Sequence, residues 1–162
     1  MKSFLTMTFI VTLVLGLAFH TPIRAGELTP REGWVVIKTS FLYNELVDRL
    51  IASVKAEKML VVTQASASGG AKAQGIVIPG NRVIGVYRND YARRMLAASI
   101  AAGIEAPIRY YVTEDPDGTA TLSYRTPSAV FAPYMDEGGD SLMALAQDLD
   151  IVFDTIARRA VE

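Results

Sequence analysis

From Trp34 onward, short runs of β-branched residues alternate with longer stretches whose apolar residues recur every three or four positions. The first pattern predicts strands and the second predicts amphipathic helices. The expected strands are 34–39, 59–63, 82–87, 107–114 and 119–125, and the expected helices are 40–58, 89–103 and 140 onward. Short connections favour antiparallel neighbours, and a helix with one apolar stripe packs on one sheet face. The sequence therefore predicts an α+β two-layer sandwich, a mainly antiparallel sheet with helices on one face, in the order β-α-β-β-α-β-β-α.

The helix ends are predicted from capping residues and glycines. Ser40 is the expected N-cap of the first helix, Asn89 or Asp90 that of the second, and Asp140 that of the third. Gly103 is expected to end the second helix. The expected buried stripes are Tyr43, Leu46, Val47, Leu50, Ile51 and Val54; then Tyr91, Met95, Leu96, Ser99 and Ile100; then Leu142, Leu145, Leu149, Val152, Phe153 and Ile156.

Two segments between these elements carry little hydrophobic pattern. Residues 64–75 are mostly Ala, Ser and Gly, whose side chains are too small to build a core, so we expect a mobile loop there. Ile76–Ile78 is predicted to be a short extended piece before the turn at Pro79-Gly80-Asn81.

The N-terminus has the organisation of an export signal. Lys2 is followed by the uncharged apolar run Phe4–Phe19, by the helix breaker Thr21-Pro22, and by the small residue Ala25. The run is shorter than the roughly 20 residues that a membrane-spanning helix needs. We therefore expect cleavage after Ala25, which leaves no membrane span; retention as an uncleaved anchor is the alternative. No cysteine follows the run, which excludes a lipid-modified cysteine anchor.

Cleavage would divide the chain into a signal peptide (1–25), a polar leader (26–32) and a single domain (33–160), located in the periplasm or secreted. The only histidine, His20, would leave with the signal, and the chain contains no cysteine. The mature protein would then lack the commonest general base, the soft metal ligands and any Cys- or His-dependent nucleophile. With no disulfide available, packing alone must stabilise the domain.

Charge restricts the partners. Lys2 and Arg24 are two of the 16 basic residues, so the mature chain would keep 14 basic residues against 17 acidic ones, a net charge of −3. A mildly acidic domain is not expected to bind nucleic acid or an anionic membrane surface.

An anion site is the strongest candidate for chemistry. Arg88 and Asn89 stand where a strand leads into a helix, whose N-terminal amides and dipole favour negative charge. Arg109 and Arg125 lie on the two hairpin strands and could approach this point if their faces match. Tyr124, like Tyr87 and Tyr111, could stack on or hydrogen-bond to a planar carboxylate. The alternative is that these arginines pair with nearby acidic residues on a solvated surface.

No metal or cofactor site is predicted. Asp115-Pro116-Asp117-Gly118 suits a tight hairpin turn, and its spacing does not fit an EF-hand loop. The acidic loop Asp136–Asp140 is better explained by helix capping. The segment Gly69–Gly75 lacks the Gly-Lys-Ser/Thr of a phosphate-binding loop and the glycine spacing of a dinucleotide fingerprint.

The chain resembles the domain of unknown function 302 family between about Gly33 and Tyr134. The residues that carry the resemblance are the first strand and helix, Ala65–Gly75, Ile84–Asn89, Ala106–Arg109, Glu114–Gly118 and Leu122–Pro127. It implies a small α+β domain and assigns no activity.

This chain departs from the family pattern at two places. Many relatives read Phe-Gly-Asn-Pro where this chain has Tyr87-Arg88-Asn89-Asp90, and Asp-His where it has Ser66-Ala67. Any role of that histidine does not transfer to this chain.

Two classes of function remain. The first is a non-catalytic binding or interaction module for a small anionic ligand or an envelope protein, with a homodimer also left open. The second is a cofactor-free enzyme, an isomerase or hydrolase acting on a small acid through Arg, Tyr and carboxylate groups. No catalytic residue can be assigned, and the absence of His, Cys and a catalytic motif from the mature chain favours the binding module.

Overall fold

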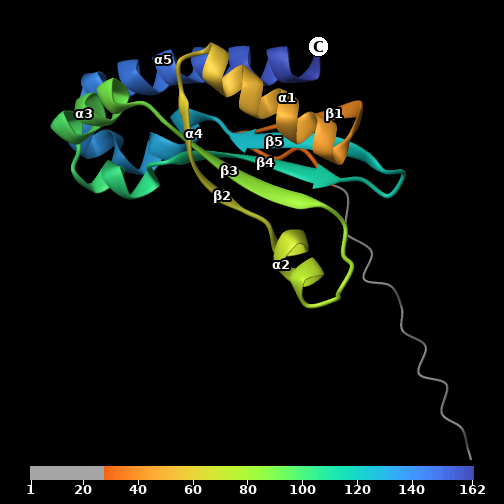
Figure 1. The fold of residues 1–162 in the computed structure, drawn as a ribbon. Helices are drawn as coiled ribbons and strands as arrows, with labels where there is room; N and C mark the ends of the chain where they lie inside the picture. The colour runs from red at the N-terminus through yellow and green to blue at the C-terminus, as the bar shows by residue number, and fades with distance from the viewer. Residues whose placement is uncertain (1–27) are drawn as a thin grey trace, which may run out of the picture.

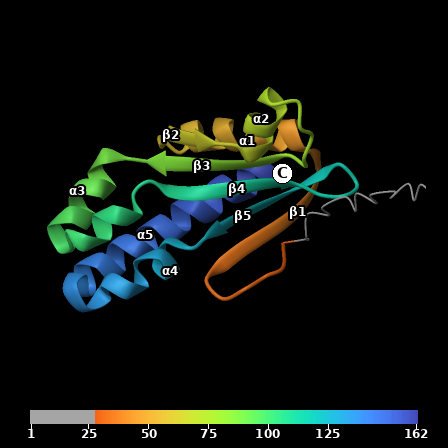
Figure 2. The ribbon, with the colours of Figure 1, turned by 90° about the horizontal axis from the view of Figure 1, so that it is seen from below.

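The computed structural model describes residues 28–162, and the predicted signal peptide, residues 1–25, lies outside them. The described strands form one antiparallel sheet in the order β1-β5-β4-β3-β2 (Figure 2). They are β1 (Trp34–Leu42), β2 (Leu60–Ala65), β3 (Asn81–Tyr87), β4 (Ile108–Glu114) and β5 (Thr119–Arg125).

Helices form a second layer on one side of this sheet (Figure 1). The helical segments of the chain are α1 (Tyr43–Ala56), α2 (Ala67–Ala73), α3 (Asn89–Ala98), the 3-10 turn η1 (Ala101–Glu105), α4 (Pro127–Phe131), the 3-10 turn η2 (Ala132–Tyr134) and α5 (Met135–Val161). α1 and α5 cover one sheet face, α2 stands apart beside the β2–β3 end, and the opposite face is largely open in Figure 2. The predicted α+β sandwich with helices on one face is confirmed.

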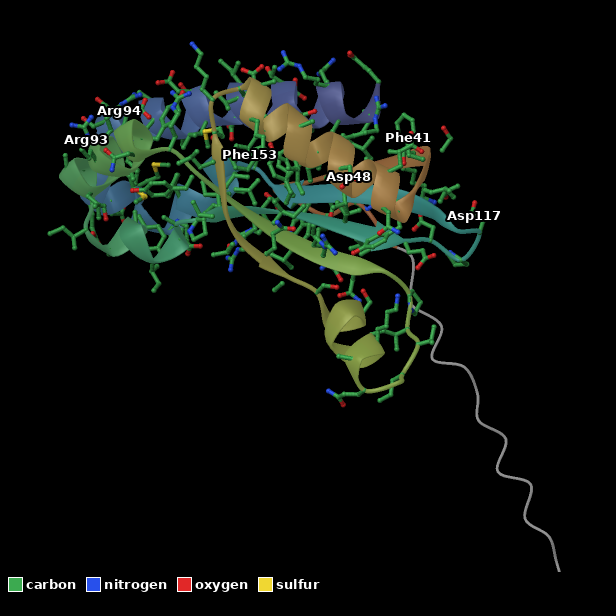
Figure 3. All side chains as sticks on the ribbon, in the orientation of Figure 1. Phe41, Asp48, Arg93, Arg94, Asp117 and Phe153 are labelled. Carbon is green, nitrogen blue, oxygen red and sulfur yellow. The ribbon has the colours of Figure 1, made fainter. Side chains whose placement is uncertain are left out.

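The hydrophobic core lies between the sheet and the helices that cover it. Leu46 and Leu50 of α1 are fully buried, as the three-and-four spacing predicts. The predicted stripe of α5 is buried in the same way, with Phe153 between α5 and the sheet (Figure 3). Its ring stacks on Tyr110 at a centroid distance of 4.8 Å and lies 5.7 Å from Tyr124. The Tyr110 hydroxyl donates to the Phe153 carbonyl at 3.0 Å, so this buried polar group is satisfied.

The prediction that Ser40 caps the first helix is wrong. β1 continues through Ser40, and α1 begins at Tyr43 after Leu42, which makes no side-chain cap. Pairing with β5 resumes at Leu42 beyond an irregularity, and the Thr39 hydroxyl bridges that irregularity by donating to the Ala120 carbonyl at 2.7 Å. Contacts with β5, distant in sequence, therefore outweigh the local capping preference.

The prediction of a mobile loop over residues 64–75 is also wrong. β2 continues to Ala65, and α2 follows it. Ser66 caps α2 by accepting a hydrogen bond from the Gly69 amide at 2.9 Å. Asn81 Oδ1 accepts from the Ala67 amide at 2.8 Å, which ties the helix to the start of β3. The Ser66 cap and this long-range hydrogen bond stabilise α2, whose small side chains contribute little hydrophobic packing.

The second helix ends earlier than predicted. α3 stops at Ala98 because Ser99 is extended, and the Ser99 hydroxyl accepts from the Ala102 amide at 3.2 Å where η1 follows. Gly103 therefore lies inside η1 rather than at the end of α3. Two residues of the predicted buried stripe are exposed, Leu96 at 47% and Ile100 at 82%.

Other boundaries differ as well. Residues 76–78 form no strand. The last helix begins at Met135, and its backbone departs from helical geometry at Gly139, where φ is 51°. Asp140 directly follows that kink, so the predicted helix start coincides with the beginning of the longer part of α5. The short helix α4, which was not predicted, starts with Thr126 accepting from the Ala129 amide and with Pro127 in its first turn.

The aromatic cluster predicts a loss of stability at high pH. Burial raises the pKa of Tyr124 to about 12, with Asp154 and Asp150 adding to the effect, and burial raises the pKa of Tyr110 well above its usual value. Between about pH 10 and 12 the folded protein keeps protons that the unfolded chain releases, so the free energy of unfolding falls as pH rises. We expect the urea midpoint to fall across that range, and to fall less steeply in Tyr124→Phe. A midpoint with no dependence on pH there would contradict the assignment.

Candidate functional site

The pairing of β4 with β5 shows which side chains lie on the sheet face that the helices leave uncovered. Tyr110 pairs directly with Tyr124, and both side chains are buried beneath the helices. Successive residues of a strand point to opposite faces, so Arg109, Tyr111 and Arg125 point away from the helices. These side chains form the wall of the open face.

Two arginines stand opposite each other on that face. Arg109 and Arg125 are each the next residue outward from the Tyr110–Tyr124 pair at the same end of the hairpin. Side chains at such positions have Cβ atoms about 4.5–5.5 Å apart, where like charges destabilise the pair. Within residues 28–162, Arg109 makes no hydrogen bond or ion pair, and Arg125 donates to the Ala129 carbonyl at 2.9 Å. No described carboxylate therefore neutralises the two guanidinium groups.

The same row of the sheet extends to both sides of the arginines. Trp34 of β1 pairs with Arg125, and Gly85 of β3 pairs with Arg109. A Cβ on Gly85 would lie 2.1 Å from Thr63 Oγ1 and 2.7 Å from Pro107 Cγ, so no side chain fits there. The row therefore runs from the Trp34 indole at one edge to Gly85, whose place on this face is covered by Thr63 and Pro107.

A groove of about 590 Å³ follows this face. Its lining residues are Trp34, Ala65, Ala67, Asn81, Val83, Glu105, Ile108, Arg109, Tyr110, Tyr111, Tyr124, Arg125 and Val130. Volumes of this size are typical of small-molecule sites. The groove is the feature of the described residues that best combines open space with free positive charge.

Two further ionisable groups lie near the charged end of the groove, Glu105 in its lining and Arg31 against the lining residue Trp34. The Arg31 guanidinium lies 5.2 Å from the centre of the Trp34 ring, a cation–π contact. Glu105 accepts a hydrogen bond from the Tyr134 hydroxyl at 2.9 Å, and this bond raises the pKa of Tyr134. The arginines thus outnumber the acidic groups at this end, although the chain as a whole is slightly acidic.

Of the predicted site residues, Arg109 and Arg125 share the groove, whereas Arg88 does not line it. Arg88 Nε lies 2.8 Å from Asp90 Oδ1, and Arg88 donates a second hydrogen bond to Asp90 Oδ2 at 3.1 Å. The Arg88 guanidinium also covers the Tyr91 ring at 4.1 Å. Hydrogen bonding to Asp90 raises the pKa of Arg88 and lowers the pKa of Asp90. Arg88 is therefore occupied by partners on its own helix.

Asn89 lies apart from the arginine pair, and Tyr124 lines the groove without turning its phenol toward that pair. Asn89 donates to the Tyr87 hydroxyl at 3.5 Å at the start of α3. The Tyr124 ring points toward the helices, 5.1 Å from Tyr110, so its phenol does not share the open face with Arg125. Tyr111 is the hairpin tyrosine on that face. Alternation along β4 and β5 is the sequence signal that separates Tyr124 from Tyr111.

Two other kinds of site are not found among the described residues. Within residues 28–162, no three or more carboxylates or histidines are grouped as a metal site would require. None of the helices in that part of the chain has the length and apolar content needed to cross a membrane.

The sequence and the fold were compared with known proteins. No curated protein matches the sequence. A crystal structure of an uncharacterized conserved protein DUF302 from Bacillus stearothermophilus is similar in fold, with a TM-score of 0.70 and 21% sequence identity. The similarity covers 80% of this chain and 99% of that chain. The model of the family described as domain of unknown function DUF302 matches residues 35–156, most of the chain, and the protein therefore belongs to this family.

Proposed function

We propose that this protein is an exported, non-catalytic binding module for a small anionic ligand, and that the groove on the open sheet face is its site. The observation that carries the proposal is the pair Arg109 and Arg125, which face each other without a described carboxylate between them. An anion between the two guanidinium groups would relieve their repulsion and accept charge-assisted hydrogen bonds from both. The export signal predicted at residues 1–25 supports a periplasmic or secreted location.

An anion would supply the counter-charge that Arg109 and Arg125 lack among the described residues. A hydrogen bond between charged groups contributes about 1.5–3 kcal/mol, more than one between neutral groups. Arg88 by comparison already holds a carboxylate, so a ligand there would have to displace Asp90. The open face offers the anion two donors that need not give up an ion pair first.

Replacing one arginine should weaken anion binding. We expect Arg109→Gln to lower the affinity for the anion by about 10- to 100-fold, because one charge-assisted contact is lost. Isothermal titration calorimetry with acetate and with inorganic phosphate measures the effect. Arg93→Gln is the matched control, since Arg93 is an exposed arginine of α3 outside the groove (Figure 3). Equal affinities for wild type and Arg109→Gln would remove Arg109 from the site.

Native mass spectrometry of the protein from its own cell envelope tests the wider proposal. The intact mass shows whether the chain begins at Gly26, and an additional mass that is lost on denaturation shows a bound ligand. An intact segment 1–25 contradicts cleavage, and a ligand-free mass contradicts tight binding.

A protein partner is the second candidate. Leu96, Ile100 and Ile104 are exposed around the junction of α3 and η1, at 47%, 82% and 80%. Apolar residues gathered on a surface are typical of protein contacts. The same mass spectrum distinguishes the cases, because a doubled mass indicates a homodimer and another added mass of protein size indicates an envelope partner.

A further inference from the structure

The groove differs in chemistry from one end to the other. Arg109 and Arg125 give one end a positive charge, with Trp34 beside them and the Arg31 guanidinium over the Trp34 ring. The other end is formed by Tyr111, Val83 and Ala65, which follow one another across neighbouring strands: Tyr111 pairs with Val83, and Val83 pairs with Ala65. This second row is apolar apart from the Tyr111 hydroxyl.

The polar side chains near the apolar end are already engaged within the protein. Asn81 Oδ1 accepts from the Ala67 amide at 2.8 Å, and Asn81 Nδ2 donates to the Pro79 carbonyl at 3.1 Å. The Ser123 hydroxyl donates to the Tyr111 carbonyl at 3.4 Å. A ligand atom placed at this end therefore meets aliphatic and aromatic surface and few free hydrogen-bonding groups.

The spacing of the sheet sets the size of the ligand. Arg109 and Tyr111 are two residues apart on one strand, which separates their positions by about 7 Å. From Tyr111 across to Ala65 is two strand spacings, about 10 Å. An anionic group held between the arginines thus leaves room along the second row for a flat body about 7–10 Å long.

From this arrangement we infer that the ligand is an amphipathic acid, with one carboxylate head and a planar apolar body of about two fused rings. This inference rests on the proposed function, since it places the head between Arg109 and Arg125. The body lies over Val83 and Ala65 and against the Tyr111 ring, where aromatic contacts add to the burial of apolar surface. A bare anion would use only one end of the groove.

The test compares probes that carry the head, the body or both. Acetate has the head, 2-naphthamide has the body, and 2-naphthoate has both. Binding to the protein purified from its own cells is measured by calorimetry and by the fluorescence of Trp34, the only tryptophan of the chain and a lining residue of the groove. We expect 2-naphthoate to bind at least tenfold more tightly than either other probe and to change Trp34 emission.

Variants separate the two ends. Tyr111→Ser should reduce the affinity for 2-naphthoate about tenfold and leave acetate unchanged, whereas Arg109→Gln should weaken both acids. Thr113→Ala is the control, since Thr113 is on the same face of β4 outside the groove.

The outcomes distinguish the inference from the function on which it rests. If 2-naphthoate and acetate bind equally and both depend on Arg109, the anion site stands and the amphipathic ligand is wrong. If 2-naphthamide binds as tightly as 2-naphthoate and Arg109→Gln has no effect, the ligand does not bind through a carboxylate head. If none of the probes binds, the proposed function and the inference both fail.

Discussion

Phe153→Ala should lower the free energy of unfolding by about 3–5 kcal/mol, the range for truncating a buried aromatic side chain. Phe153 has no exposed surface, and its ring lies between α5 and the sheet, stacked on Tyr110 and tilted against Tyr124. Its removal leaves a cavity beneath two tyrosines whose positions are fixed by strand pairing, so the space cannot close easily. Urea denaturation of wild type and variant measures the difference.

Ile151→Ala on the same helix is the matched control. Ile151 is 69% exposed, and substitutions at exposed positions usually change stability by no more than about 0.5 kcal/mol. A loss below about 1 kcal/mol for Phe153→Ala would mean that α5 does not pack on the sheet as described.

Gly85→Ala should destabilise the protein by about 2–3 kcal/mol, near the upper end of the usual cost of overpacking. The new Cβ would lie 2.1 Å from Thr63 Oγ1 and 2.7 Å from Pro107 Cγ, much closer than atoms can approach. Thr63 can rotate, but the ring of Pro107 is rigid, so the strands must shift. Thermal denaturation followed by circular dichroism measures the loss.

Two companion variants identify the cause. Gly70→Ala in α2 meets no atom within 4 Å, and alanine favours helix, so this variant should be at least as stable as wild type. Adding Thr63→Ala to Gly85→Ala removes the closest contact and should restore part of the stability. If the double variant is no more stable than Gly85→Ala, the Thr63 contact is not responsible.

Much of the fold follows from short-range patterns. The strands and the stripes of α1 and α5 were predictable because burial imposes a period of two or of 3.6 on neighbouring residues. The failures occur where distant contacts decide. β1 passes through Ser40 because β5 holds it, and α2 forms where Asn81 contributes a bond to its first turn. Helix α4 carried a local signal, Thr126-Pro127, that could have been recognised.

The candidate site was predictable in part for the same reason. The hairpin turn at Asp115–Gly118 sets the pairing of β4 with β5, and this pairing places Arg109 opposite Arg125 and turns Tyr124 inward. Trp34 and Val83 were not predicted as groove residues, because the pairing of β1 with β5 and of β3 with β4 depends on residues far apart in sequence. The sequence groups Arg88 with the other arginines because it does not show that Asp90 forms an ion pair with Arg88.

Along strand β4, residues that pack against the helices alternate with residues that line the groove. Tyr110 and Val112 hold the sheet to the helices, whereas Arg109 and Tyr111 face the groove. Because the two faces of β4 consist of different residues, the outward residues of β4 can be exchanged with little effect on its buried residues. A library that randomises only Arg109 and Tyr111 of β4 would therefore retain its fold, and selection from it could redirect this scaffold to other small molecules.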